Sequence, residues 1–275
     1  MTNLASCHLG QGVFNSRSTS LDCEKGEVTP FTVMSYNIRL GIGLVPVQGA
    51  LYDMPWGQNI GAIINEIRSV NPDIIGLQEV AGIDQARELG EALQMNYAYV
   101  GHETPRPGGS WWGVAILSKY PILESNGVEL SFDPGNQKSM IVSTLTMADK
   151  RVTILNVHKD KDLYDGVSIK RIMERVSEIK GPSILVGDFN IAPDESNGRL
   201  ELVKIKFSDT AELLDTKKVE EVKKIGTSIR SNRRIDYVFI NPNFFNVEDV
   251  GVTVQSPEQV PASDHRAPYA RLSWK

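Results

Sequence analysis

Polar side chains stand where the apolar runs of this sequence stop, and their types can bind metals and move protons. Carboxylate and amide oxygens are the ligands that Mg²⁺ prefers, and histidine is the side chain whose charge changes near neutral pH. These residues are Asn37, Glu79, His158, Asp188, Asn190, Asp236, Asp264 and His265. Ligands of α/β proteins gather at strand ends, where rigid elements hold loop side chains, so these residues are candidates for one site.

Each of these positions also has a purely structural interpretation. An Asn or Asp at a strand end is usually a turn former, and a single histidine is more often a satisfied structural residue. Gln78-Glu79 by itself could be an ordinary strand terminus. The functional interpretation is favoured because all of these positions occur together in one chain.

Apolar periodicity indicates strands and helices around these positions. Helices are expected at 60–70, 84–95 and 166–180. Strands are expected at 31–37, 73–79, 97–101, 113–118, 126–131, 138–147, 151–158, 183–188, 234–240, 247–254 and 266–273. A strand, a helix and a second strand follow in order twice, over 31–79 and 151–188, which suggests two similar halves that each contribute a sheet.

Composition and length place the chain among ordinary globular proteins. Of its 275 residues, 41% are apolar and 23% charged, which argues against a collagen-like, coiled-coil or disordered chain. Such a length buries a sizeable core without disulfides or a structural metal. No linker or composition break divides the chain, so we expect one domain at 31–275, preceded by a polar N-terminal arm at 1–30.

The N-terminal residues give little information about location. No apolar run reaches the roughly twenty residues that a membrane span needs, and no charged-then-apolar signal pattern is present, so a cytoplasmic protein is the default expectation. Leu4-Ala5-Ser6-Cys7 does spell a lipobox, although no apolar segment precedes it. Cys7 and Cys23 could form one bridge, which leaves the redox compartment open.

The distribution of charge carries one asymmetry. The net charge is −5, from 29 basic and 34 acidic residues, which weighs against tight sequence-independent binding of a nucleic-acid duplex. Residues 199–234 nevertheless hold ten basic and six acidic residues. Within them, a solvated helix is the simpler interpretation of Lys217–Lys224. Arg230, Arg233 and Arg234 come just before the strand of Asp236, a position that suits contact with a phosphate-bearing substrate.

Two adjacent tryptophans form a further candidate for substrate contact. Trp111 and Trp112 follow a flexible Pro/Gly-rich stretch and precede the expected strand at 113–118. They could stack on a base or insert into a membrane. Capping of the core by these rings is an equally good interpretation.

The polar positions lie in seven short blocks that follow one another in a fixed order. The blocks are Ser35-Tyr-Asn37-Ile, Ile75-Gly-Leu-Gln-Glu79-Val, Gly113-Val-Ala-Ile-Leu-Ser118, Asn156-Val-His158, Val186-Gly-Asp-Phe-Asn190, Arg234-Ile-Asp236-Tyr-Val-Phe and Ser263-Asp-His265. In them the sequence resembles the endonuclease/exonuclease/phosphatase superfamily of DNase I-like metal-dependent phosphoesterases, over residues 33–272. The resemblance implies an α/β fold, a four-layer α/β/β/α sandwich of two mixed, mainly antiparallel sheets with the site at one edge.

The resemblance also implies a metal site. Glu79 is expected as the principal ligand of Mg²⁺, for which Mn²⁺ could substitute, with Asn37 and Asp264 assisting. This agrees with the preference of Mg²⁺ for a few carboxylates, waters and substrate phosphate. Cleavage of a phosphodiester needs such charge neutralisation on the phosphate.

Catalytic roles follow from the same resemblance. Asp188 is expected to orient or deprotonate the attacking water, and Asn190 to position the phosphate. His265 is expected at the scissile phosphate, with Asp236 fixing its tautomer through the other ring nitrogen. His158 is expected to donate to a phosphate oxygen or to the leaving group.

Departures from particular branches of the superfamily narrow the expected substrate. Val80 and His158 replace the Thr and Tyr that AP endonucleases usually carry, and residues 185–190 lack the longer Trp-aromatic block of inositol phosphatases. A phosphodiesterase with nuclease activity on DNA or RNA is the favoured function. The alternative is sphingomyelinase-like or inositol-phosphatase-like hydrolysis of lipid or small-molecule phosphoesters. A third possibility is a catalytically inactive binding module. The presence of every expected site residue argues against it.

Overall fold

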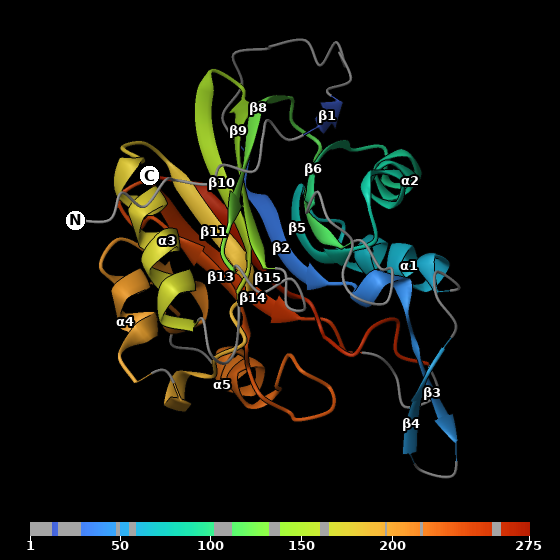
Figure 1. The fold of residues 1–275 in the computed structure, drawn as a ribbon. Helices are drawn as coiled ribbons and strands as arrows, with labels where there is room; N and C mark the ends of the chain where they lie inside the picture. Colours follow the sequence, from blue (N-terminus) through green and yellow to red (C-terminus); the bar gives the residue numbers. More distant parts are fainter. Residues whose placement is uncertain are drawn as a thin grey trace, which may run out of the picture.

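Two sheets packed face to face form the body of the molecule (Figure 1). The computed structural model describes residues 13–15, 29–47, 50–54, 59–101, 112–131, 138–159, 165–195, 197–214, 217–254 and 260–275. Within them one sheet has the strand order β1 (Val13–Asn15), β6 (Asn96–Gly101), β7 (Gly113–Ser118), β5 (Ile74–Val80), β2 (Phe31–Asn37), β15 (Pro268–Trp274) and β14 (Phe245–Val252). The other has the order β12 (Ser208–Asp209), β13 (Asp236–Ile240), β11 (Ser183–Asp188), β10 (Lys150–His158), β9 (Ser139–Met147) and β8 (Ile122–Glu129).

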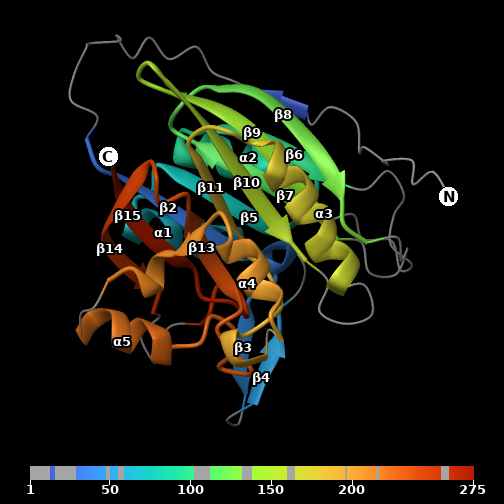
Figure 2. The same ribbon diagram turned by 90° about the vertical axis from the view of Figure 1, so that its left-hand side faces the viewer.

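Helices cover the outer faces of both sheets (Figures 1 and 2). The seven-stranded sheet carries α1 (Ile60–Val70) and α2 (Ile83–Leu93), and the six-stranded sheet carries α3 (Asp165–Glu178) and α4 (Arg199–Lys204). Shorter elements are α5 (Lys217–Lys224), which packs against β14, and the 3-10 turns η1 (Arg39–Gly41), η2 (Pro193–Glu195) and η3 (Thr210–Glu212). This layering confirms the four-layer α/β/β/α sandwich expected from the sequence.

The alternation of side chains along each strand divides the apolar residues among three clusters. In β10, Ile154 points into the layer between the sheets, whereas its neighbour Leu155 packs under α3 and α4. In β5, Ile74 points between the sheets and Ile75 packs under α1 and α2. Because both faces of the central strands are covered, these strands appear in the sequence as continuous apolar runs.

Each sheet contains one parallel pair of strands that is joined through a helix. β2 runs parallel to β5 through α1, and β10 runs parallel to β11 through α3. The other strand pairs described are antiparallel. The two strand–helix–strand units expected from the sequence are therefore confirmed, one in each sheet. Their carboxyl ends supply four polar residues of the site, Asn37, Glu79, His158 and Asp188.

A polar link crosses the interior between the sheets just behind these strand ends. Nδ2 of Asn156, in β10, donates to the carbonyl oxygens of Leu77 and Ala115 across the interface, each at 2.8 Å. Nε2 of Gln78 in turn donates to Oδ1 of Asn156 at 2.6 Å. Gly76 leaves room for this amide, because a Cβ there would lie 2.9 Å from its Cγ. The link therefore fixes the register of one sheet against the other where the strands end.

Some elements differ from the sequence expectation. β8 begins at Ile122 rather than near 126. The hairpin of β3 (Leu44–Val47) and β4 (Ala50–Asp53) was not expected, since it lies outside both main sheets and the side chains of β4 show no alternation of buried and exposed positions. Val13–Asn15, within the expected arm, pairs with β6 as an edge strand. Cys7, Cys23 and Trp111 lie outside the described residues.

Candidate active site

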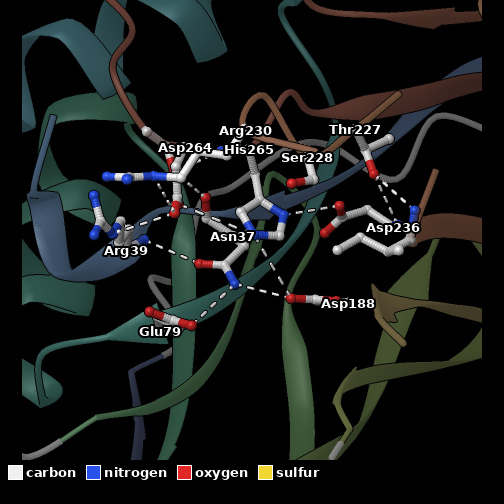
Figure 3. Close-up of polar contacts among 12 residues, drawn as sticks. Asn37, Arg39, Glu79, Asp188, Thr227, Ser228, Arg230, Asp236, Asp264 and His265 are labelled. Carbon is white, nitrogen blue, oxygen red and sulfur yellow. Dashed lines mark hydrogen bonds and ion pairs between the residues drawn. The ribbon is translucent and has the colours of Figure 1, made fainter. Parts of the chain in front are cut away.

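The strand ends of both sheets bring the expected site residues together (Figure 3). Asn37 is the last residue of β2, and Glu79 is the last but one of β5. His158 and Asp188 end β10 and β11, where they pair in register, and Asp236 begins β13 directly opposite Asp188. Sheet pairing alone thus places three of these side chains side by side.

The amide of Asn37 joins the two sheets at the centre of the site. Its Nδ2 donates to Oδ2 of Asp188 at 3.0 Å and to Oε1 of Glu79 at 3.3 Å. Its Oδ1 accepts the backbone N–H of Arg39 at 3.0 Å, which fixes the orientation of the amide. In this arrangement Asn37 acts as a donor to two carboxylates, and metal ligation by its side chain stays a prediction.

Glu79 occupies a strained and largely buried position, with its side chain 16% exposed. Its φ of 54° lies in the left-handed region, at a bulge where the register of β5 against β7 shifts between Gln78 and Val80. Such strain in a residue other than glycine points to function. Burial raises the pKa of the Glu79 carboxyl, and the ammonium of Lys138 opposes that rise. A bound cation would stabilise this buried carboxylate further.

His265, which is partly buried, pairs with the buried Asp236. Nδ1 of His265 lies 2.9 Å from Oδ2 of Asp236. The hydroxyl of Ser263 accepts the backbone N–H of His265 and donates to the carbonyl of Asn37, which anchors the loop to β2. Burial alone would lower the pKa of His265, but Asp236, with other nearby carboxylates, raises it to about 10. The imidazole is therefore protonated at neutral pH, and its Nε2 faces Asp188 at 3.9 Å.

Asn190 supports Asp188 from the following turn. Its backbone N–H donates to Oδ1 of Asp188 at 2.8 Å, and its Nδ2 donates to the carbonyl of Lys159 at 3.0 Å. Asn190 has a φ of 54°, a conformation that asparagine tolerates better than most residues. The turn thereby holds the Asp188 carboxylate toward Asn37 and His265.

Lys138 is a buried cation at the site that the sequence patterns did not single out. Its Nζ lies 2.6 Å from Nε2 of His158 and 5.2 Å from the ring centre of Trp112. Because an ammonium only donates, His158 accepts this bond, and Lys138 carries the proton that could be offered to a phosphate. Ser139 pairs with His158 across β9 and β10, so the register of that hairpin was the signal that could have located Lys138.

Two arginines hold Asp264, which was expected as a metal ligand. Its Oδ2 lies 3.3 Å from Nε of Arg39 and 3.9 Å from Nε of Arg230, and its Oδ1 lies 4.0 Å from Nε2 of His265. Asp53, from the β3–β4 hairpin, contacts both arginines as well. Sequence reasoning did not find Arg39 or Asp53, since neither belongs to a block that ends a long apolar strand.

The remaining candidates for substrate contact lie in different surroundings. Arg233 pairs with Glu195 on the surface. The guanidinium of Arg234 lies 2.6 Å from Oδ2 of the buried Asp209 and above the ring of Tyr237, so it is engaged inside the protein. Trp112 is half-buried, and its ring meets that of His158 edge-on at 5.7 Å. Of these side chains, Trp112 lies beside the site and Arg234 is turned away from solvent.

Two sets of side chains could hold a cation. Asp188, Asp236 and His265 each offer an atom within 4.8 Å of the others, but a protonated imidazole is not a metal ligand. Glu79 and Asp188 offer carboxylate oxygens, which both lie 3.7 Å from Nε2 of His158. Two converging carboxylates are the donors that a hard divalent cation prefers, so these residues fit Mg²⁺, while a ligand role for Asp264 stays a prediction.

A four-layer sandwich with carboxylates, amides and a His–Asp pair at one edge defines a class of phosphoester hydrolases. The chain belongs to the Endonuclease/Exonuclease/phosphatase family, whose sequence profile matches residues 34–265. Members of this family hydrolyse phosphoesters.

Three individual proteins with a similar sequence or fold are 18% to 27% identical to this chain. The chain is 27% identical over 237 residues to the Carbon catabolite repressor protein 4 homolog 3 of Arabidopsis thaliana, covering 76% of this chain and 51% of that protein. It thus spans about half the length of this curated relative. The structure of a mannosyl-6-phosphatase from Bacteroides thetaiotaomicron superposes with a TM-score of 0.62 at 24% identity, covering 88% of this chain and 99% of the other. The human Nocturnin catalytic domain, solved with a bound sulfate, superposes with a TM-score of 0.67 at 18% identity, covering 96% and 97%.

These structural similarities support the fold but do not identify the substrate of this chain. None of the described helices is long and apolar enough to cross a membrane.

Proposed function

We propose that this protein is a Mg²⁺-dependent phosphodiesterase with nuclease activity. The observation that carries the proposal is the convergence of Glu79, Asp188 and His265 on one space, through the Asn37 amide and the 3.9 Å approach of His265 Nε2 to Asp188 Oδ2. Bound metal would supply charge neutralisation on the phosphate and on the leaving oxygen.

The side chains of the protein then have distinct tasks. Asp188 accepts a proton from the attacking water, and its own position is held by the Asn190 N–H and the Asn37 amide. His265, whose Nδ1 is engaged by Asp236, presents a protonated Nε2 to the phosphate and can give that proton to the leaving oxygen. Because Asp236 holds one nitrogen, only one tautomer of a neutral His265 fits after the transfer.

Two features beside the site support a nucleic-acid substrate. Trp112 lies against His158 on one side, where a ring could stack on a base. Arg39 and Arg230 lie beside Asp264, where guanidinium groups could bind backbone phosphate. An aromatic ring and cations around a hydrolytic centre suit a single strand, whose bases are exposed.

The charge of the rim favours a second candidate, a phosphoesterase for small substrates. Asp53 and Asp264 offset the two arginines, and the chain as a whole carries −5. Acidic surfaces repel long polyanions. A small phosphoester would meet less of that repulsion than a polynucleotide.

A divided substrate panel with Mg²⁺ tests both candidates. It contains single- and double-stranded DNA, RNA, bis-p-nitrophenyl phosphate, sphingomyelin, inositol phosphates and sugar phosphates, each with an EDTA control. We expect EDTA-sensitive cleavage of single-stranded nucleic acid and of the nitrophenyl diester. Cleavage confined to sugar or inositol phosphates would favour the second candidate, and activity that survives EDTA would contradict metal dependence.

A matched pair of variants ties the activity to this site. Asp188→Asn removes the charge of the expected base but keeps its shape, so turnover should fall by at least about 10²-fold. Asp194→Asn makes the same change at an exposed position of η2 and should retain wild-type turnover. Equal activity of the two variants would overturn the role of Asp188.

A further inference from the structure

Two guanidinium groups from distant parts of the chain meet over one carboxylate beside the site. Arg39 follows β2, Arg230 lies in the loop before β13, and Asp53 ends β4. Nη1 and Nη2 of Arg39 lie 2.7 and 2.8 Å from the two oxygens of Asp53, and Nη2 of Arg230 lies 2.5 Å from Oδ1. Three segments that share no strand pairing with one another thus converge on Asp53.

This arginine pair, Arg39 and Arg230, borders the catalytic centre directly. Figure 3 shows both arginines beside Asp264. Oδ2 of Asp264 lies 3.3 Å from Nε of Arg39, and its Oδ1 lies 4.0 Å from Nε2 of His265. One carboxylate therefore separates the pair from the imidazole that is proposed to contact the scissile phosphate.

The backbone directs Arg39 toward this place at some cost. Arg39 and Leu40 have φ angles of 47° and 59°, in the left-handed region that residues with a side chain rarely adopt. The backbone N–H of Arg39 donates to Oδ1 of Asn37, so the turn is tied to the centre of the site. Strain of this kind is kept where it serves a function.

The geometry at Asp53 is the one with which arginine holds a phosphate. A guanidinium presents two parallel N–H groups that match two oxygens of a carboxylate or a phosphate. Arg39 holds both oxygens of Asp53 in this way, while Arg230 reaches one of them. Asp53 thus lies where two phosphate oxygens would fit.

Asp53 is also easily displaced. Its side chain is 50% exposed and that of Arg230 is 46% exposed. The hairpin that carries Asp53 projects from the end of the sandwich (Figure 2), and the side chains of β4 are largely exposed. The half-exposed pair with Arg230 contributes about 0–1 kcal/mol, and the bidentate pair with Arg39, whose side chain is 20% exposed, contributes more. A phosphate carries more negative charge than Asp53 and offers the same oxygen geometry, so it can compete for the two arginines.

We propose that Arg39 and Arg230 form a second anion subsite, which binds a phosphate group next to the one that is cleaved, and that Asp53 occupies this subsite until the substrate displaces it. The favoured substrate therefore carries at least two phosphate groups. The second can be a neighbouring diester of a polynucleotide or a terminal phosphomonoester. This inference rests on the proposed function only for the place of the scissile phosphate.

A binding experiment without turnover tests the subsite itself. Inorganic phosphate is titrated into the full chain in EDTA and followed by phosphorus NMR. Asp53→Asn should lower the dissociation constant by up to about 5-fold, the equivalent of one surface ion pair, and Arg230→Gln should raise it. Asp84→Asn and Arg87→Gln, which break an exposed pair on α2, are the matched controls and should match wild type. Identical constants for Asp53→Asn and wild type would overturn the subsite, whether or not the protein cleaves any substrate.

A kinetic experiment identifies the source of the second phosphate. The substrates are the thymidine dinucleotide TpT, its 5′-phosphorylated form pTpT and the trinucleotide TpTpT, compared by kcat/KM. Arg230→Gln should lower the preference for the two-phosphate substrates over TpT by about tenfold, mainly through KM, because a charge-assisted hydrogen bond is lost. Asp53→Asn should raise that preference. The form whose preference changes, pTpT or TpTpT, names the source, and equal losses on all three substrates would show a merely structural role.

Discussion

The buried centre and the exposed rim of the site are built in different ways. In the centre, Asn37, Asp188 and Asp236 are each 1% exposed and stand at the ends of paired strands. At the rim, Arg39 and Arg230 lie in connections between strands, and their side chains are 20% and 46% exposed. Register in the two sheets fixes the centre, whereas surface ion pairs hold the rim.

This difference separates chemistry from selection of the substrate. Groups in a water-poor centre interact strongly and cannot rearrange without cost. Ion pairs at the rim are worth little each, so a ligand can exchange them. We therefore expect substitutions in the centre to change turnover, and substitutions at the rim to change which substrate is preferred.

The largest effect is expected in the centre, at His265. His265→Gln keeps a hydrogen-bond donor for Asp236 but removes the proton that titrates. Turnover of the best substrate should fall about 10²- to 10⁴-fold, as for other general acid–base residues. The measurement is kcat on that substrate, with circular dichroism to show that the variant is folded. A folded variant with more than about a tenth of wild-type turnover would remove His265 from the chemistry.

The centre was also the part of the site that the sequence predicted best. Asn37, His158 and Asp188 end apolar runs, and apolar runs are what periodicity detects. Parallel neighbours then bring such ends together without any knowledge of the loops. Helix α1 and the two strand–helix–strand units were predicted for the same reason, whereas the four-layer fold class was expected from the resemblance of the seven blocks to the superfamily.

The rim and Lys138 needed information that one sequence does not carry. Arg39 owes its direction to a left-handed backbone conformation, and Asp53 belongs to β4, whose side chains are largely exposed. Lys138 lies beside His158 only because of the register between β9 and β10. A left-handed turn and the register of two hairpins decide these positions, and apolar periodicity does not detect either. The same holds for Val13–Asn15, whose strand exists only through its pairing with β6.

An intermediate effect is expected at Lys138, which is buried like the centre but was not part of the recognised pattern. Lys138→Met removes a charged hydrogen bond to His158 and the cation that lowers the pKa of Glu79. We expect kcat/KM to fall about 10- to 100-fold, and the Mg²⁺ concentration for half-maximal activity to fall as well, because no neighbouring ammonium then repels the metal. Magnesium titrations of activity measure both quantities.

Lys150 provides the matched control for that variant. Its Nζ lies 4.2 Å from the ring centre of Trp274, so it also stacks on a tryptophan, but it lies at the start of β10, the end opposite His158. Lys150→Met should leave both the activity and its magnesium dependence at wild-type values. If Lys138→Met keeps wild-type activity and magnesium dependence as Lys150→Met does, Lys138 contributes nothing to catalysis. Burial beside His158 would then not be enough to assign a residue to the centre.

The last prediction concerns the pH dependence of stability, which measures how strongly His265 interacts with Asp236. The raised pKa of His265, about 10 against an ordinary value of 6.5, means that its pairing stabilises the fold fully below pH 6.5 and that this stabilisation is lost as the pH rises toward 10. Asp236→Asn removes the carboxylate that raises this pKa most, so less stabilisation remains to be lost. Urea unfolding at pH 7 and pH 10 should therefore show a larger drop in the free energy of unfolding for wild type than for the variant. Equal drops would mean that His265 is neutral at pH 7, and Asp236 would then hold it by a hydrogen bond without an ion pair.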